Sequence, residues 1–199
     1  MSALTKIMKY NEGFVNEGNY QEFETTKYPD QKIVILTCMD TRLLELLQKA
    51  IGLKNGDAKI IRNAGAVIAN PFDSVMRSIL ISIHEFETKE VFIIGHHECG
   101  MASLQAEAIL EKIKGQGIDE KCIDTIIQSG ISLSDWLTGF GCVEKSVSQS
   151  VNIVKNHPLV PNNVVVHGLV IHPQTGQLEL VIDGNENKQE SSIEEGIYV

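Results

Sequence analysis

Three side chains of different chemistry end an apolar run near the start of the chain. In the segment "ILTCMDTRLLE", residues 35–45, Cys38, Asp40 and Arg42 occupy alternate positions. A thiolate can bind a metal or act as a nucleophile, a carboxylate can accept a proton, and a guanidinium can hold a carboxylate ionised. This segment is therefore the first candidate for a reactive site.

A second candidate lies in "GHHECGM", residues 95–101, where His96 and Cys99 are three positions apart. This spacing, where a strand turns into a helix, lets both side chains face one ion. If the strand ending at Cys38 is a neighbour, the three residues form a Cys₂His set with one open position, which is typical of catalytic zinc. His97 is the alternative ligand, but it would face away if His96 faces inward. We predict His96.

The charge of this set indicates what the neighbouring residues do. Two thiolates cancel the charge of Zn²⁺, so the site is formally neutral and acidifies bound water less than a three-histidine site does. We expect Asp40 to accept a hydrogen bond from zinc-bound water or hydroxide, and Arg42 to keep Asp40 ionised through a bidentate pair. The plainer alternative is that Asp40 caps a helix and Arg42 forms a surface ion pair.

A turn of small residues follows another apolar run in "IRNAGAV", residues 61–67. Ala64 and Gly65 would let backbone N–H groups approach a small anion, with Arg62 nearby. We therefore predict that Ala64 and Gly65 bind the substrate or an anion.

Short apolar runs alternate with longer stretches of helical periodicity, which indicates an α/β fold with a mainly parallel sheet. We expect a single domain whose central sheet has the order 2-1-3-4 plus an antiparallel edge strand, flanked by helices. The predicted strands are 32–38, 58–63, 91–96, 163–171 and 177–183, with a hairpin turn at 172–177. The predicted helices are 42–52, 73–87 and a group across 100–157 that is broken at 115–117 and 138–141.

Composition excludes several classes of protein. The chain has 199 residues, 43% of them hydrophobic, and a formal charge of −9, which suits one globular domain and disfavours nucleic acid as a partner. No run approaches the length of a membrane span, and the first residues lack the apolar core of a signal peptide. We expect a cytoplasmic protein with no membrane partner, in which Cys122 and Cys142 pack as small apolar side chains.

The two ends of the chain differ from its centre. Residues 1–30 carry aromatic side chains on an otherwise polar segment, and composition alone allows them to pack on their own sheet or to form an arm across a second subunit. Residues 184–199 form a polar tail, which we expect to be solvated.

Three motifs, "CMDTR", "GDAKIIRNAGA" and "GHHECGM", in this order and spacing, resemble those of the β-class carbonic anhydrases. The resemblance covers most of the chain, because "VVVHGLVIHPQTGQLELV" is similar to the closing strands of the family. It implies zinc on Cys38, His96 and Cys99, an Asp40–Arg42 dyad, and reversible hydration of carbon dioxide to bicarbonate. It also implies a homodimer or higher homo-oligomer with a helical N-terminal arm, and a closed state in which Asp40 becomes the fourth ligand.

Other activities fit the same motifs. One is hydrolysis of CS₂ or COS by the same zinc chemistry, and another is a non-catalytic zinc protein in which Asp40 closes the site permanently. A third is a Cys38 nucleophile with a histidine base. Many members of the family also carry two glycines where this chain has Gly65 and Ala66.

Overall fold

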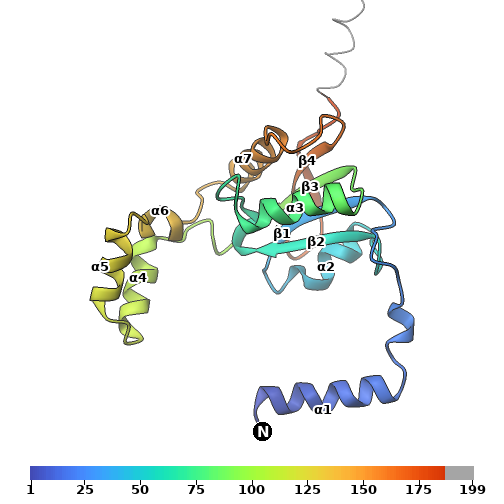
Figure 1. The fold of residues 1–199 in the computed structure, drawn as a ribbon, viewed down its shortest axis with the longest axis horizontal. Coiled ribbons are helices and arrows are strands. Elements are labelled where there is room, and N and C mark those ends of the chain that lie inside the picture. The colour runs from blue at the N-terminus through green and yellow to red at the C-terminus, as the bar shows by residue number, and fades with distance from the viewer. Residues whose placement is uncertain (187–199) are drawn as a thin grey trace, which may run out of the picture.

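The computed structural model describes residues 1–186, which hold a five-stranded sheet in the order β2-β1-β3-β4-β5 (Figure 1). The first four strands run parallel to one another, and the fifth runs antiparallel to the fourth. The predicted α/β class and strand order are confirmed. The strands are β1 (Ile33–Cys38), β2 (Ala58–Asn63), β3 (Glu90–His96), β4 (Val165–Ile171) and β5 (Leu178–Ile182).

The sheet is covered on both faces, which explains why its central strands are continuously apolar. Along β1, Val34 and Leu36 face one core cluster while Ile35 faces the other, and all three are at most 1% exposed. The predicted strand bounds differ from the observed ones by at most two residues. Burial on both faces fixes the register of β1 and places its carboxyl end at one edge of the sheet.

Three helices pack directly on the sheet. The helix α2 (Leu43–Ala50) lies on one face, whereas α3 (Ser74–Glu85) and α7 (Val143–Lys155) lie on the other (Figure 1). The Asp73 side chain accepts a hydrogen bond from the Met76 N–H and so caps α3, as the predicted helix start at 73 requires.

The contact between α7 and the sheet depends on two glycines. A Cβ atom at Gly95 would lie 2.7 Å from Val143 and 2.8 Å from Val147, and one at Gly168 would lie 2.8 Å from Val147. Because real Cβ atoms do not approach that closely, any larger residue would push α7 off strands β3 and β4. The close approach at Gly95 holds the carboxyl end of β3 firmly, immediately before the predicted ligand His96.

The stretch 100–157 contains more breaks than the sequence indicated. Helices α4 (Ala106–Gly115), α5 (Glu120–Gln128) and α6 (Leu133–Leu137) form a lobe beside the sheet (Figure 1). The breaks at 115–117 and 138–141 are confirmed, but a further break at 129–132 was not predicted. Gly130 has φ 90° there, a left-handed conformation that ends α5.

The N-terminal segment stands away from the sheet. Its helix α1 (Ala3–Asn16) contains no buried residue, and a short 3₁₀ turn η1 (Gln21–Phe23) joins it to the body (Figure 1). Tyr28, in contrast, packs edge-on against Phe86 at 6.0 Å between ring centroids. Within residues 1–186, none of the helices combines the length and apolar character needed to cross a bilayer. All but the first three residues of the predicted tail lie outside the described residues.

Candidate metal centre

The carboxyl ends of β1 and β3 bring three sulfur and nitrogen donors together. Cys38 ends β1, His96 ends β3, and Cys99 lies in the loop that follows. Their ligand atoms all lie within 4.8 Å of one another, and the three residues are 4%, 1% and 6% exposed. The neighbouring parallel strands thus achieve the juxtaposition on which the predicted Cys₂His set depends.

The state of His96 suits a metal ligand. Its Nδ1 lies 2.8 Å from the carbonyl oxygen of His97, which can only accept, so Nδ1 carries the proton and Nε2 offers a lone pair. That Nε2 is buried and has no hydrogen-bond partner among the described residues. A buried polar atom without a partner is unfavourable, and a cation between Nε2 and the thiols would satisfy it.

The distance between the two sulfurs also suits zinc. The Sγ atoms of Cys38 and Cys99 are 3.9 Å apart, far beyond the ~2.05 Å of a disulfide. Two sulfurs bound at ~2.3 Å to a tetrahedral zinc ion would be about 3.8 Å apart. The donor set and the spacing of its two sulfurs therefore fit a tetrahedral ion.

The thiols are biased toward ionisation at one sulfur. A hydrogen bond from Cys99 lowers the pKa of Cys38 and the Gly65 N–H acts in the same direction, although burial opposes both. The same contact raises the pKa of Cys99, so that without a metal the pair retains one proton. A divalent cation would displace that proton and bind both sulfurs as thiolates.

Asp40 and Arg42 form the bidentate pair that their spacing indicated. The Arg42 Nε donates to Asp40 Oδ1 at 3.0 Å, and Nη2 donates to Oδ2 at 2.9 Å. These hydrogen bonds lower the pKa of Asp40 to about 2, so its carboxylate is ionised at neutral pH. Asp40 Oδ2 also lies 3.8 Å from His96 Nε2, which places the carboxylate beside the candidate metal position.

Glu98, which is not among the predicted site residues, contacts the same guanidinium. Arg42 Nη1 donates to the Glu98 carboxylate at 3.2 Å, and Nη2 donates to the Glu98 carbonyl oxygen at 3.1 Å. An acidic residue next to Cys99 was visible in the sequence, but its partner, 56 positions away, was not.

His97 lies on a different side of the loop from His96. Its Nε2 is 3.2 Å from the carboxylate of Glu179 on β5, and its side chain is 30% exposed. Consecutive residues at the end of a strand point in opposite directions, and this separates the two histidines. His97 is therefore not part of the donor group.

The small-residue turn lies against the donors, but its polar groups have partners other than an anion. Ala64 and Gly65 lie in η2 (Ala64–Ala66), where Gly65 has φ 82° and its N–H donates to Cys38 Sγ at 3.3 Å. Arg62 points elsewhere, because its guanidinium donates to the carbonyl oxygens of Cys38 and Leu43. Anion binding by Ala64 and Gly65 remains a prediction, and Arg62 does not support it in the way we expected.

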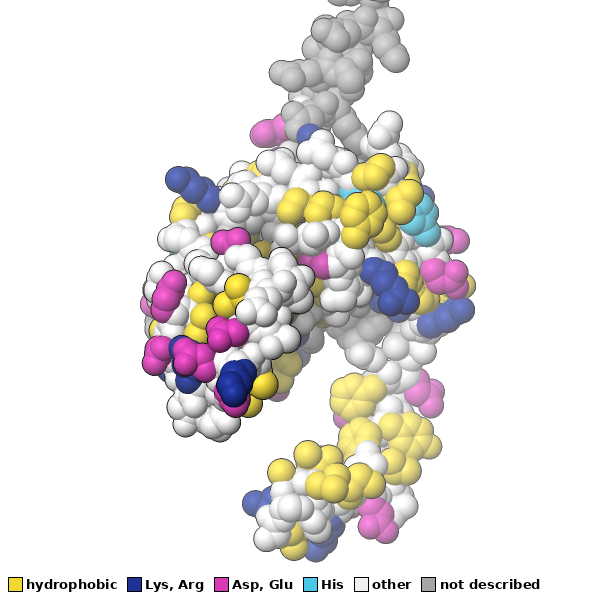
Figure 2. Space-filling model, turned by 60° about the vertical axis from the view of Figure 1, so that its left-hand side comes forward, with side chains coloured by type: hydrophobic (Ala, Val, Ile, Leu, Met, Phe, Trp, Pro, Cys, Tyr) yellow, Lys and Arg dark blue, Asp and Glu magenta, His cyan; other side chains and the backbone are white. Residues whose placement is uncertain are grey.

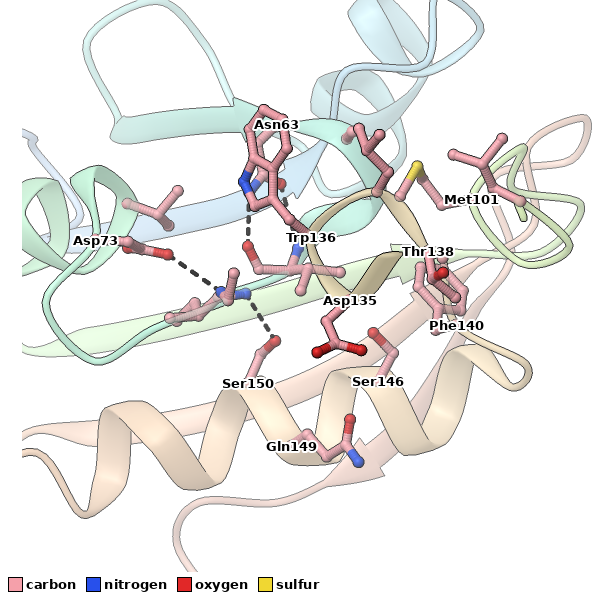
Figure 3. Close-up of a pocket in the computed structure, with 18 of the residues that line it drawn as sticks. Asn63, Asp73, Met101, Asp135, Trp136, Thr138, Phe140, Ser146, Gln149 and Ser150 are labelled. Carbon is pink, nitrogen blue, oxygen red and sulfur yellow. Dashed lines mark hydrogen bonds between the residues drawn. The ribbon is translucent and has the colours of Figure 1, made fainter. Parts of the chain in front are cut away.

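Two cavities adjoin the donors. One of about 460 Å³ is lined by Cys38, Asp40, Arg42, Ala64 and Cys99, among others. A larger one, of about 1050 Å³, shares Ala64 and Met101 with it and extends between α6 and α7. Figure 3 shows Asp135 of α6 pointing toward Ser146 and Gln149 of α7 at the larger cavity.

The other two cysteines are remote from this group. Cys122 is exposed on α5, and Cys142 precedes α7, where its thiol donates to the Glu144 carboxylate at 2.9 Å. The expectation that both pack as apolar side chains is thus not met, because Cys122 lies on the surface of the lobe and the Cys142 thiol is hydrogen-bonded to a carboxylate.

Comparison with known proteins places the chain in a family. Residues 33–178 match the family model described as carbonic anhydrase, and the strand order and helix arrangement are those of the β class. The chain therefore belongs to the β-carbonic anhydrase family, as its motifs indicated.

Individual relatives differ in the reaction that their names describe. The chain is 57% identical over 188 residues to "Putative carbonic anhydrase YvdA" of Bacillus subtilis, which covers 94% of this chain and 95% of that protein. It is 31% identical to a carbon disulfide hydrolase of Acidithiobacillus thiooxidans over 75% of this chain and 76% of that one. Among solved structures, a β-carbonic anhydrase of Trichomonas vaginalis superposes with a TM-score of 0.84 at 36% identity, covering 92% of this chain and 100% of the other.

Proposed function

We propose that this protein binds Zn²⁺ through Cys38, His96 and Cys99 and catalyses the reversible hydration of carbon dioxide to bicarbonate and a proton. The observation that carries the proposal is the buried donor group with an unpartnered imidazole nitrogen, directly beside the Asp40–Arg42 pair. The 57% identity over nearly the whole chain to a relative named "Putative carbonic anhydrase" favours carbon dioxide over carbon disulfide as substrate.

Each residue has a distinct part in this proposal. Zinc, when bound, supplies a Lewis acid that makes water nucleophilic at neutral pH. Asp40 accepts a hydrogen bond from the attacking water and so orients its lone pair toward carbon dioxide, and Arg42 keeps Asp40 ionised for that task. The cavity that Ala64 lines beside the thiols has room for a linear molecule and its bicarbonate product.

We further propose that the protein is a cytoplasmic homodimer or higher homo-oligomer. Apolar side chains of α1, including Leu4, Ile7 and Met8, are 59–69% exposed. Figure 2 shows hydrophobic side chains gathered along this projecting arm. A second copy of the chain would cover them, because exposed apolar faces of this kind mark association surfaces.

The test is metal content together with stopped-flow hydration of carbon dioxide, followed by hydrolysis of COS and CS₂ with the same preparation. We expect one zinc ion per chain and rapid hydration that chelation abolishes. Hydrolysis of CS₂ without hydration of carbon dioxide would favour the hydrolase, and zinc without either activity would favour the non-catalytic protein. A metal-independent activity sensitive to thiol alkylation would favour the Cys38 nucleophile.

A further inference from the structure

Arg42 is anchored on two sides, and only one of them belongs to the Asp40 pair. Toward Asp40 it donates from Nε and Nη2, and toward Glu98 it donates from Nη1 and Nη2. The side chain of Arg42 is 39% exposed. A long exposed side chain held by one partner samples several rotamers, whereas one held by two partners in different directions has a single orientation.

The backbone at Glu98 contributes to the second anchor. Its φ is 55°, in the left-handed region that non-glycine residues seldom occupy. The carbonyl oxygen in this conformation accepts from Arg42 Nη2, while the side chain accepts from Nη1. Glu98 lies between His96 and Cys99, so this contact connects the ligand loop to the end of β1.

Asp40 is the group that this arrangement controls. Its Oδ2 lies 3.8 Å from His96 Nε2, so a small rotation would carry the carboxylate onto the metal position. Arg42 opposes that rotation as long as its own orientation is fixed. We propose that Glu98 is a positioning residue that fixes Arg42 and thereby holds Asp40 off the metal, free to orient water. This inference rests on the proposed zinc function.

The competing interpretation is an ordinary surface ion pair. The Glu98 side chain is 57% exposed, and exposed pairs contribute little to stability. The two interpretations differ in one respect. A surface pair has no effect on the metal, whereas a positioning residue changes the metal environment, and only when both Arg42 and Asp40 are present.

The experiment uses Co²⁺ in place of Zn²⁺, because the visible absorption of a cobalt ion reports its ligands. Glu98→Gln removes the charge but keeps an acceptor, and Glu98→Gly removes the side chain while tolerating the left-handed backbone. We expect both spectra to move from that of the wild type toward that of Arg42→Ala, in which Asp40 is released. Hydration should fall roughly five- to tenfold, with the larger loss for glycine.

Coupling provides the decisive comparison. In an Asp40→Asn background the Glu98 substitutions should leave the cobalt spectrum unchanged, because the group they release is gone. Glu87→Gln is the matched control, since Glu87 also has a positive φ of 56° and an exposed ion pair, with Lys32 at 2.7 Å. We expect this control to match the wild type.

Several results would overturn the inference. One is that the Glu98 variants have the cobalt spectrum of the wild type, and another is that Arg42→Ala has it too. The inference also fails if the Glu98 substitutions change the spectrum as much in the Asp40→Asn background as in the wild type, or if Glu87→Gln changes it as much as they do. If the variants show the expected spectral coupling but the wild type does not hydrate carbon dioxide, the positioning role of Glu98 is supported and the proposed reaction is refuted. Failure to bind cobalt would refute both.

Discussion

The unpartnered Nε2 of His96 and the two adjacent sulfurs determine what substitution of single residues will do. We expect Cys38→Ser, His96→Ala and Cys99→Ser each to lose most bound zinc and all readily measured hydration, because each removes one donor of the Cys₂His group. Elemental analysis of purified variants measures the zinc directly.

The controls for these variants are close in sequence and chemistry. His97→Ala and Cys142→Ser should retain zinc, since His97 contacts Glu179 and Cys142 contacts Glu144 instead of the donor group. Loss of zinc from His97→Ala with retention in His96→Ala would reverse our choice of ligand.

Asp40→Asn separates the role of the carboxylate from metal binding. The variant should keep zinc, because the three donors remain, yet hydrate carbon dioxide about 100-fold more slowly or worse. Arg42 lowers the pKa of Asp40 to about 2, so the carboxylate remains ionised from pH 6.5 to 9 and does not titrate there. The loss should therefore be similar at every pH in that window.

Stopped-flow rates and zinc content across about pH 6.5 to 9 test this expectation. A variant as active as the wild type would remove Asp40 from the mechanism. A loss confined to one end of the pH range would mean that Asp40 titrates there, against the direction of its pKa shift.

At the scale of elements, the sheet could be predicted because each strand is recognisable from its own short run of residues. Each of the first three strands is an apolar run, and their common direction brings Cys38 and His96 to one edge. The contact of Glu98 with Arg42 could not be predicted, because it depends on a left-handed residue within the ligand loop. The break at Gly130 was missed for a similar reason, since a single glycine does not end every helix.

Long-range backbone contacts also connect the lobe to the metal loop. The Gly139 N–H donates to the Leu104 carbonyl, and the Phe140 N–H donates to that of Met101, two residues beyond Cys99. A Cβ atom at Gly139 would overlap the backbone carbonyl of Met101, which cannot move as a side chain could. This connection requires glycine.

We therefore expect Gly139→Ala to lower the free energy of unfolding by about 1–3 kcal/mol and to reduce zinc occupancy. Thermal and denaturant unfolding measure the first effect, and elemental analysis measures the second. Gly141→Ala is the control, because a Cβ atom at Gly141 meets no atom within 4 Å. Equal stability of the two variants would contradict a close contact at Gly139.

At the scale of the whole molecule, α1 leaves its apolar side chains exposed in a single chain. Leu4, Ile7, Met8 and Val15 recur at helical spacing on one side, and each is more than half exposed. An isolated helix of this length is marginal in water, so α1 needs a partner surface to be stable. Composition alone allowed packing on the sheet of the same chain, but α1 buries no residue there.

A charge on the apolar side of α1 should dissociate the assembly. We expect the wild-type protein to sediment as a dimer or larger species. The double variant Ile7→Glu, Met8→Glu should sediment close to the 22.0 kDa of one chain, because burial of two carboxylates in an apolar contact is strongly unfavourable. Lys6→Glu introduces the same side chain on the opposite side of the helix and should leave the mass unchanged. Analytical ultracentrifugation over a range of concentrations measures each mass. A wild type that is monomeric at every concentration, or a double variant with wild-type mass, would show that this side of α1 does not hold the subunits together.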